Sequence, residues 1–97
     1  MGTYIGLCNY TDQGIRTVEE SPSRSDAGRA LLKDLGGEMK QVYMTLGAYD
    51  FVIVFELPSD EAAASFLLSI GKLGNVRTTT LKAFDAAATR DIIANLP

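Results

Sequence analysis

The sequence predicts a single α+β domain, residues 1–97, built on a four-stranded antiparallel sheet. The chain has 97 residues, which suits one compact domain, and 46% of them are apolar, as in a globular protein. Four segments rich in β-branched and aromatic residues are interspersed with two segments whose apolar residues repeat at helical spacing. The second and third strand segments are joined by only a Gly-Ala pair, which indicates an antiparallel hairpin.

The first half of the chain supplies a strand, a loop and a helix. The segment TYIGLCNY, residues 3–10, alternates imperfectly and is rich in β-forming residues. The polar segment 11–21 is expected to be a long surface loop. Pro22 suits the first turn of a helix that has Ser21 as its N-cap, and two glycines end this helix at 36–37. Its apolar residues repeat at a spacing of four, at Ala27, Leu31 and Leu35.

The second half supplies three strands and two helices. Residues 38–46 form the second strand, with Met39, Gln41 and Tyr43 expected on one side, and residues 49–57 form the third. A helix starts at 58–61, where acidic residues suit the helix dipole. Its apolar stripe comprises Ala63, Phe66, Leu67, Ile70 and Leu73. Residues 76–84 form the fourth strand, and Asp85 caps a short terminal helix.

This order of elements is that of a ferredoxin-like fold. Right-handed crossovers give the strand order 4-1-3-2 and place both main helices on one face of the sheet. The run FVIVF at 51–55 is apolar toward both faces, so one set of its side chains would meet water on the open face. A second copy of the chain would cover this face, and we therefore expect a homodimer, a dimeric α/β barrel. The alternative is that the C-terminal helix folds over the open face.

Polar residues from three distant segments are expected to meet at one end of the sheet, where the first strand ends and the third and fourth begin. These residues are Asn9, Tyr10, Tyr49, Asp50 and Arg77. Beneath the loop 11–21 they would line a ligand-binding pocket, in which Asp50 is the candidate catalytic base. Alternatively, Asp50 and Arg77 form an ion pair that fixes the strand register, and the tyrosines are ordinary half-buried aromatic residues.

Three segments of the chain resemble the GYD-domain family of small bacterial and archaeal proteins: NYTDQGIR, GAYDFVIVFELPSDEAAASF and LGNVRTTTLKAF. The namesake residues correspond to Gly47, Tyr49 and Asp50, and the resemblance covers nearly the whole chain. It implies membership of the dimeric α/β-barrel superfamily, in which two ferredoxin-like sheets pack face to face. That superfamily includes cofactor-free monooxygenases, haem-degrading enzymes, isomerase-like enzymes and ligand-sensing domains, so the resemblance does not select one activity.

The composition argues against several classes of function. Histidine is absent and Cys8 is the single cysteine, so we expect no cofactor and no metal site. A net charge of −3 without a basic cluster argues against nucleic-acid binding, and no apolar stretch is long enough for a membrane span. A single cysteine fits a reducing cytoplasm.

Three functions stay open at this point. The chain is a dimeric small-molecule binding or sensing module, a cofactor-independent monooxygenase- or isomerase-like enzyme with Asp50 as base, or a purely structural assembly unit. The first is favoured, because the sequence shows no activated nucleophile.

Overall fold

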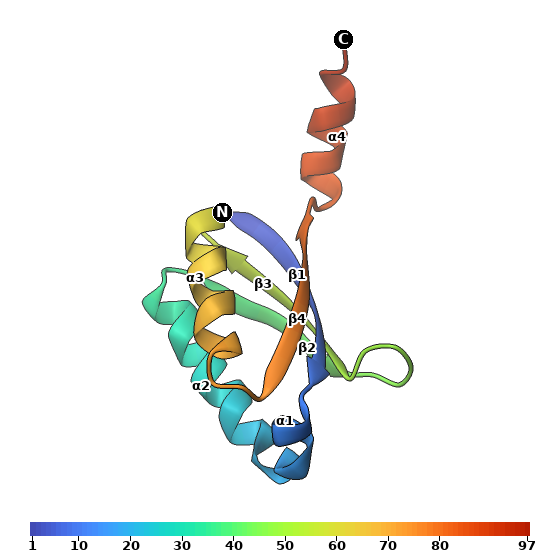
Figure 1. Cartoon of the computed structure of the whole chain (residues 1–97). Helices are drawn as coiled ribbons and strands as arrows, with labels where there is room; N and C mark the ends of the chain where they lie inside the picture. The colour runs from blue at the N-terminus through green and yellow to red at the C-terminus, as the bar shows by residue number, and fades with distance from the viewer.

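A computed structural model, which describes all 97 residues, confirms the ferredoxin-like order of elements (Figure 1). The ferredoxin-like unit consists of strand β1 (Gly2–Tyr10), helix α2 (Ser21–Asp34), strand β2 (Glu38–Met44), strand β3 (Phe51–Leu57), helix α3 (Asp60–Gly71) and strand β4 (Val76–Ala83). A last helix, α4 (Ala86–Ala94), follows it. Neighbouring strands are antiparallel, and the order β2-β3-β1-β4 is the predicted order read from the opposite edge.

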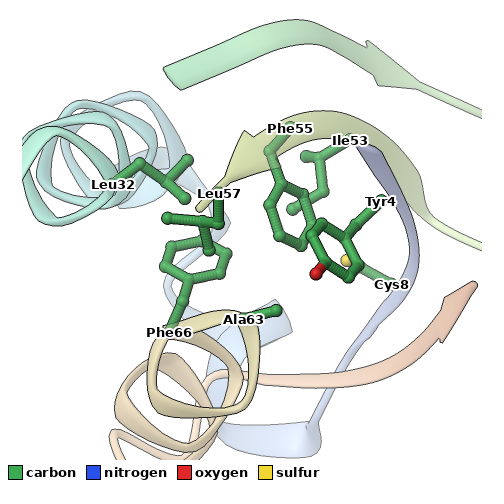
Figure 2. Packing of buried hydrophobic residues seen from close by; sticks show 8 residues of the cluster. All are labelled: Tyr4, Cys8, Leu32, Ile53, Phe55, Leu57, Ala63 and Phe66. Atoms are coloured by element: carbon green, nitrogen blue, oxygen red, sulfur yellow. The ribbon is translucent and has the colours of Figure 1, made fainter. Parts of the chain in front are cut away.

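The core lies between the sheet and the helices α2 and α3, which cover one face of it (Figures 1 and 2). Phe55 of β3 is fully buried at its centre, where its ring lies 5.4 Å from that of Tyr4 and 5.1 Å from that of Phe66. Aromatic pairs at such distances add to the free energy gained by burial alone. The buried residues of the core are Tyr4, Cys8, Leu32, Ile53, Phe55, Leu57, Ala63 and Phe66.

The segment that the sequence predicts as a loop is largely helical. Helix α1 (Asp12–Arg16) follows β1, and a 3-10 turn, η1 (Val18–Glu20), leads into α2. Thr11 caps α1, because its hydroxyl accepts a hydrogen bond from the Gly14 N–H at 3.0 Å. The predicted N-cap of α2 is wrong: Ser21 is already helical, and its hydroxyl lies 3.2 Å from the Tyr10 hydroxyl.

Strand β2 does not alternate as strictly as the sequence predicts. The register with β3 shifts between Met39 and Gln41, which marks a β-bulge. The extra residue turns Met39 toward the helices, where it packs against the core together with Val42. Met39 and Gln41, predicted on one side, therefore point to opposite faces.

The buried stripe of α2 is also displaced from the predicted one. Leu32 is the one fully buried residue of this helix. Leu31 and Leu35 flank it half-buried, whereas Ala27 is exposed. The helix is therefore rotated by about one residue relative to the predicted stripe, because Leu32 is the side chain that reaches the core.

The open face of the sheet has no cover within the chain. Here the register pairs Ile5 with Val54 and Leu7 with Val52, and Leu81 beside Ile5 is 47% exposed. The alternative that the C-terminal helix folds over this face is wrong. Helix α4, which Asp85 caps as predicted, extends away from the sheet beyond the end of β4 (Figure 1).

Candidate functional site

Asp50 closes the hydrogen-bond ladder between β1 and β3. Its backbone N–H donates to the Cys8 carbonyl at 2.9 Å. Its carboxylate accepts a hydrogen bond from the Tyr10 N–H, with 2.8 Å between Oδ2 and N. The side chain thus takes the place of the next backbone acceptor in the ladder. A backbone N–H group in a half-buried position needs an acceptor, so the aspartate before the apolar strand has a structural reason to be there.

The turn between β2 and β3, residues 45–50, is held by hydrogen bonds at its base. Thr45 donates its N–H to the Asp50 carbonyl at 2.9 Å and its hydroxyl to the Tyr49 carbonyl at 2.6 Å. Gly47 has a φ of +106°, a backbone conformation that favours glycine. In the orientation that satisfies both atoms of its amide, Asn9 donates to the Ala48 carbonyl at 3.2 Å. The Gly-x-Tyr-Asp residues therefore build a braced turn that projects away from α2 and α3 (Figure 1).

The alternative in which Asp50 and Arg77 form an ion pair is wrong. No carboxylate lies within 4.0 Å of the Arg77 guanidinium, and the ion pairs of the chain involve Arg24, Lys40 and Lys82 instead. Arg77 is exposed opposite Asn9 in the register of β1 with β4. Tyr10 follows Asn9 in β1 and so points to the other face, where its ring lies 5.4 Å from that of Phe51. The structure therefore separates Asn9 and Arg77 from Tyr10 by the thickness of the sheet.

Helix α1 is fixed to the segment that leads into β4. The Thr11 hydroxyl donates to the Gly74 carbonyl at 2.5 Å, and the Gln13 side chain donates to the Leu73 carbonyl at 3.0 Å. A Cβ atom at Gly14 would lie only 1.9 Å from the Asn75 carbonyl oxygen, so this contact requires glycine. Residues 11–16 are therefore held against the segment before β4 by these contacts.

A cavity of about 540 Å³ lies between α2, α3 and the covered face of the sheet. Pockets for small molecules commonly have volumes of about 300–1,000 Å³ and mainly apolar walls. Thirteen of the 20 residues that line this cavity are hydrophobic, among them Leu31, Phe51 and Ile70. Its polar lining residues are Tyr10, Ser21, Arg24, Ser25, Ser69 and Asn75. Of the predicted site residues it takes in Tyr10, whereas Asn9, Tyr49, Asp50 and Arg77 lie outside its lining.

Gly28 is the sequence signal by which this cavity could have been found. It lies in the interior of α2, where glycine costs about 1 kcal/mol relative to alanine. It also lines the cavity, and a Cβ atom at this position would have no neighbouring atom within 4 Å. The helix therefore lacks a side chain where one would begin to fill the cavity.

Three potentially reactive groups outside the cavity, those of Cys8, Tyr4 and Lys82, are held in unreactive states. Burial raises the pKa of the Cys8 thiol to about 12, so the thiol stays protonated. The Tyr4 hydroxyl donates to Asp60 at 2.5 Å, and the Lys82 amine lies 3.0 Å from the same carboxylate. Burial raises the pKa of Tyr4, and the bond to Asp60 raises the pKa of Lys82. A neutral phenol and a charged amine are poor nucleophiles, so this cluster links β1, β4 and α3 structurally.

No group of three or more Cys, Asp or Glu side chains lies close enough together to hold a metal ion. None of the helices has both the length and the apolar character of a membrane span.

Comparisons with known proteins agree with the fold and show the family. The glutamine synthetase and cystathionine beta-lyase binding protein of Thermus thermophilus is 36% identical over 97 residues, 99% of each chain. The crystal structure of FFRP-DM1 has a TM-score of 0.59 at 23% identity, over 87% of this chain and 100% of that one. A feast or famine regulatory protein from M. tuberculosis, complexed with L-methionine, has a TM-score of 0.58 at 21% identity. That match covers 89% of this chain and 52% of the regulator.

The two structural likenesses show the fold alone, because both identities are below 25%. Family membership rests on the sequence. The family model described as GYD domain matches residues 4–93, which include the whole ferredoxin-like unit except the first two residues of β1. The chain therefore belongs to the GYD-domain family.

Proposed function

We propose that the chain is a dimeric module that binds a small molecule in the cavity between α2, α3 and the sheet. The cavity itself is the observation that carries this proposal, since it has the volume and apolar lining of a ligand pocket. The unreactive states of Cys8 and Lys82 favour binding over catalysis at those residues. Tyr10 connects the cavity to the predicted polar end, because its backbone N–H contacts Asp50 while its ring lines the cavity.

A thermal-shift screen tests the binding proposal. A compound that binds only the folded chain raises its stability by about 2.7 kcal/mol at 100 times its dissociation constant. We expect at least one compound of a chemically mixed library to raise the melting temperature, and the effect to be lost in Gly28→Leu, which places a side chain in the cavity. If no compound stabilises the chain, or if Gly28→Leu responds as the natural chain does, the proposal fails.

The dimer is proposed from the open face of the sheet. The apolar centre of this face is formed by Ile5, Leu7, Val52 and Val54. Full burial of one such side chain stabilises by about 1.5–3 kcal/mol. A second copy placed over the open face would cover this apolar centre, as a two-fold symmetric interface does.

Light scattering at micromolar concentration tests the dimer. Val54→Asp would place a charge in the proposed apolar interface and should give monomers or unfolded chains. The matched control is Ala64→Asp, an equally acidic change on the exposed side of α3, which should remain dimeric. A well-folded monomer in the natural chain would refute the dimer.

A second candidate function is docking to a metabolic enzyme. It is favoured by the Thermus thermophilus relative, whose name describes binding to glutamine synthetase and cystathionine beta-lyase. On this chain, Leu46 and the apolar residues of α4, such as Ile93 at 61% exposure, are available to a partner. Biolayer interferometry with glutamine synthetase of the source organism, using Leu46→Ser as the variant, tests this docking. Unchanged binding by the variant would remove Leu46 from the interface.

In the enzymatic alternative Asp50 is the base, Arg77 stabilises an enolate or carboxylate of the substrate, and Tyr49 or Tyr10 donates a hydrogen bond. The observation that favours it is the second carboxylate oxygen of Asp50. Oδ2 is engaged by the Tyr10 N–H, whereas Oδ1 accepts no hydrogen bond within the chain. Asp50→Asn would abolish turnover in this alternative, and retained turnover would refute it.

A further inference from the structure

We infer that the cavity takes a neutral, largely apolar ligand with one hydroxyl or carbonyl end, and that it rejects free amino acids and other charged molecules. This inference rests on the proposed function and names the chemical class of its ligand. It follows from the charges and hydrogen bonds of the lining residues.

The cavity offers a charged ligand no free counter-charge. None of its 20 lining residues is an aspartate or glutamate, so an ammonium group would find no carboxylate there. Its one cationic residue is Arg24. The guanidinium of Arg24 donates to the Gly14 carbonyl at 3.3 Å and to the Thr17 carbonyl at 2.8 Å. It also lies 3.6 Å from the Glu20 carboxylate, so its charge already has a partner.

Charged ligands are therefore excluded on energetic grounds. Moving an ionised group from water into an apolar site is costly unless the site pairs it. A free amino acid carries two such groups, and the cavity provides for neither of them. This preference would separate the chain from the regulator of similar fold that was solved with L-methionine.

One rim of the cavity suits a single neutral polar group. The hydroxyls of Tyr10 and Ser21 lie 3.2 Å apart, and Ser25 lines the cavity one turn further along α2. Hydroxyls both donate and accept hydrogen bonds, so they can serve a ligand hydroxyl or carbonyl without any charge. Asn75 contributes less, because its Oδ1 already accepts a hydrogen bond from the Gln13 amide at 3.0 Å.

The test uses a neutral apolar dye, Nile red, and competitors that share one phenyl ring and a short alkyl chain. These are 3-phenyl-1-propanol, 3-phenylpropionate, 3-phenylpropylamine and phenylalanine. We expect Nile red to bind and the alcohol to displace it with an apparent Kd at least about tenfold below those of the three charged compounds. The leucine of Gly28→Leu should weaken dye binding at least about tenfold, and Gly28→Ala should weaken it less.

Gly71→Ala is the matched control, because its added Cβ also meets no atom within 4 Å and position 71 is outside the lining. Circular dichroism shows that each variant is folded. The inference would be overturned if phenylalanine or another charged compound displaced the dye as strongly as the alcohol does, and if this displacement were lost in Gly28→Leu. The proposed binding function would then still hold. Failure of the dye and of every competitor to bind would overturn both. If the dye binds Gly28→Leu as tightly as the natural chain, it binds outside the cavity, and both proposals are overturned.

Discussion

Replacing Asp50 by alanine should destabilise the fold by removing the acceptor of the Tyr10 N–H. A hydrogen bond to a charged group contributes about 1.5–3 kcal/mol. Both residues are half-buried, so water can partly replace the lost bond, and we expect about 1.5–2 kcal/mol. Asp50→Asn keeps an acceptor oxygen but loses the charge, which should cost about 1 kcal/mol. For a domain of this size these losses lower the melting temperature by about 6–16 °C and 4–8 °C respectively.

Urea unfolding at neutral pH measures both variants. Asp26→Ala is the control, since Asp26 is exposed on α2 and makes no ion pair or side-chain hydrogen bond, and it should change stability by less than about 0.5 kcal/mol. Because Asp50 and Arg77 do not form an ion pair, a double-mutant cycle should show coupling below about 0.5 kcal/mol. An alanine variant as stable as the control would refute the ladder-closing role. An asparagine variant that unfolds normally but no longer binds any ligand would assign the carboxylate to function instead.

Two further predictions concern the ends of the covered face. Gly14→Ala should destabilise the chain by about 1–3 kcal/mol or more in urea unfolding, since the new methyl group meets the Asn75 carbonyl. The control Gly71→Ala should not destabilise it, because there is open space around Gly71. Equal urea midpoints of the two variants would contradict the contact between Gly14 and Asn75. Acid should weaken the Tyr4–Asp60–Lys82 cluster, because the Tyr4 hydroxyl and Lys82 hold the pKa of Asp60 below its usual value of 3.8. This stabilisation is fully present above that value and is lost as the pH falls through the folded-state pKa, so Asp60→Asn should lose less stability than the natural chain between about pH 6 and pH 3. Parallel losses in the two proteins would refute the cluster.

Much of the fold could be predicted from the sequence, because its signals are local. Ser59 and Asp85 each precede a helix and cap it, accepting hydrogen bonds from Ala62 N–H at 3.1 Å and Ala88 N–H at 2.8 Å. Gly47 supplies the positive φ of the turn between β2 and β3. Once the order of strands and helices is known, the right-handed crossover rule leaves one sheet topology. The uncovered apolar face follows from that topology and from the run at 51–55.

The candidate site was predicted less well, because it depends on contacts between residues far apart in the chain. The sequence brings Asp50 to the same end of the sheet as Tyr10, but only the structure shows that the carboxylate binds a backbone N–H rather than Arg77. Within the predicted loop, Thr11 is a local helix-capping signal that is difficult to recognise among other polar residues. The close contact of Gly14 with Asn75, in contrast, is set by tertiary packing.

The bulge in β2 and the cavity both depend on contacts between segments that are distant in the sequence. A one-residue shift of register decides which face Met39 joins, and strand pairing rather than strand sequence sets that shift. The cavity beside Gly28 is lined by residues of α2, α3 and the sheet, so the packing of these elements decides its shape rather than the sequence of α2 alone. Local backbone preferences thus specify the elements of this protein, whereas packing between distant segments decides which side chains meet and where space for a ligand remains.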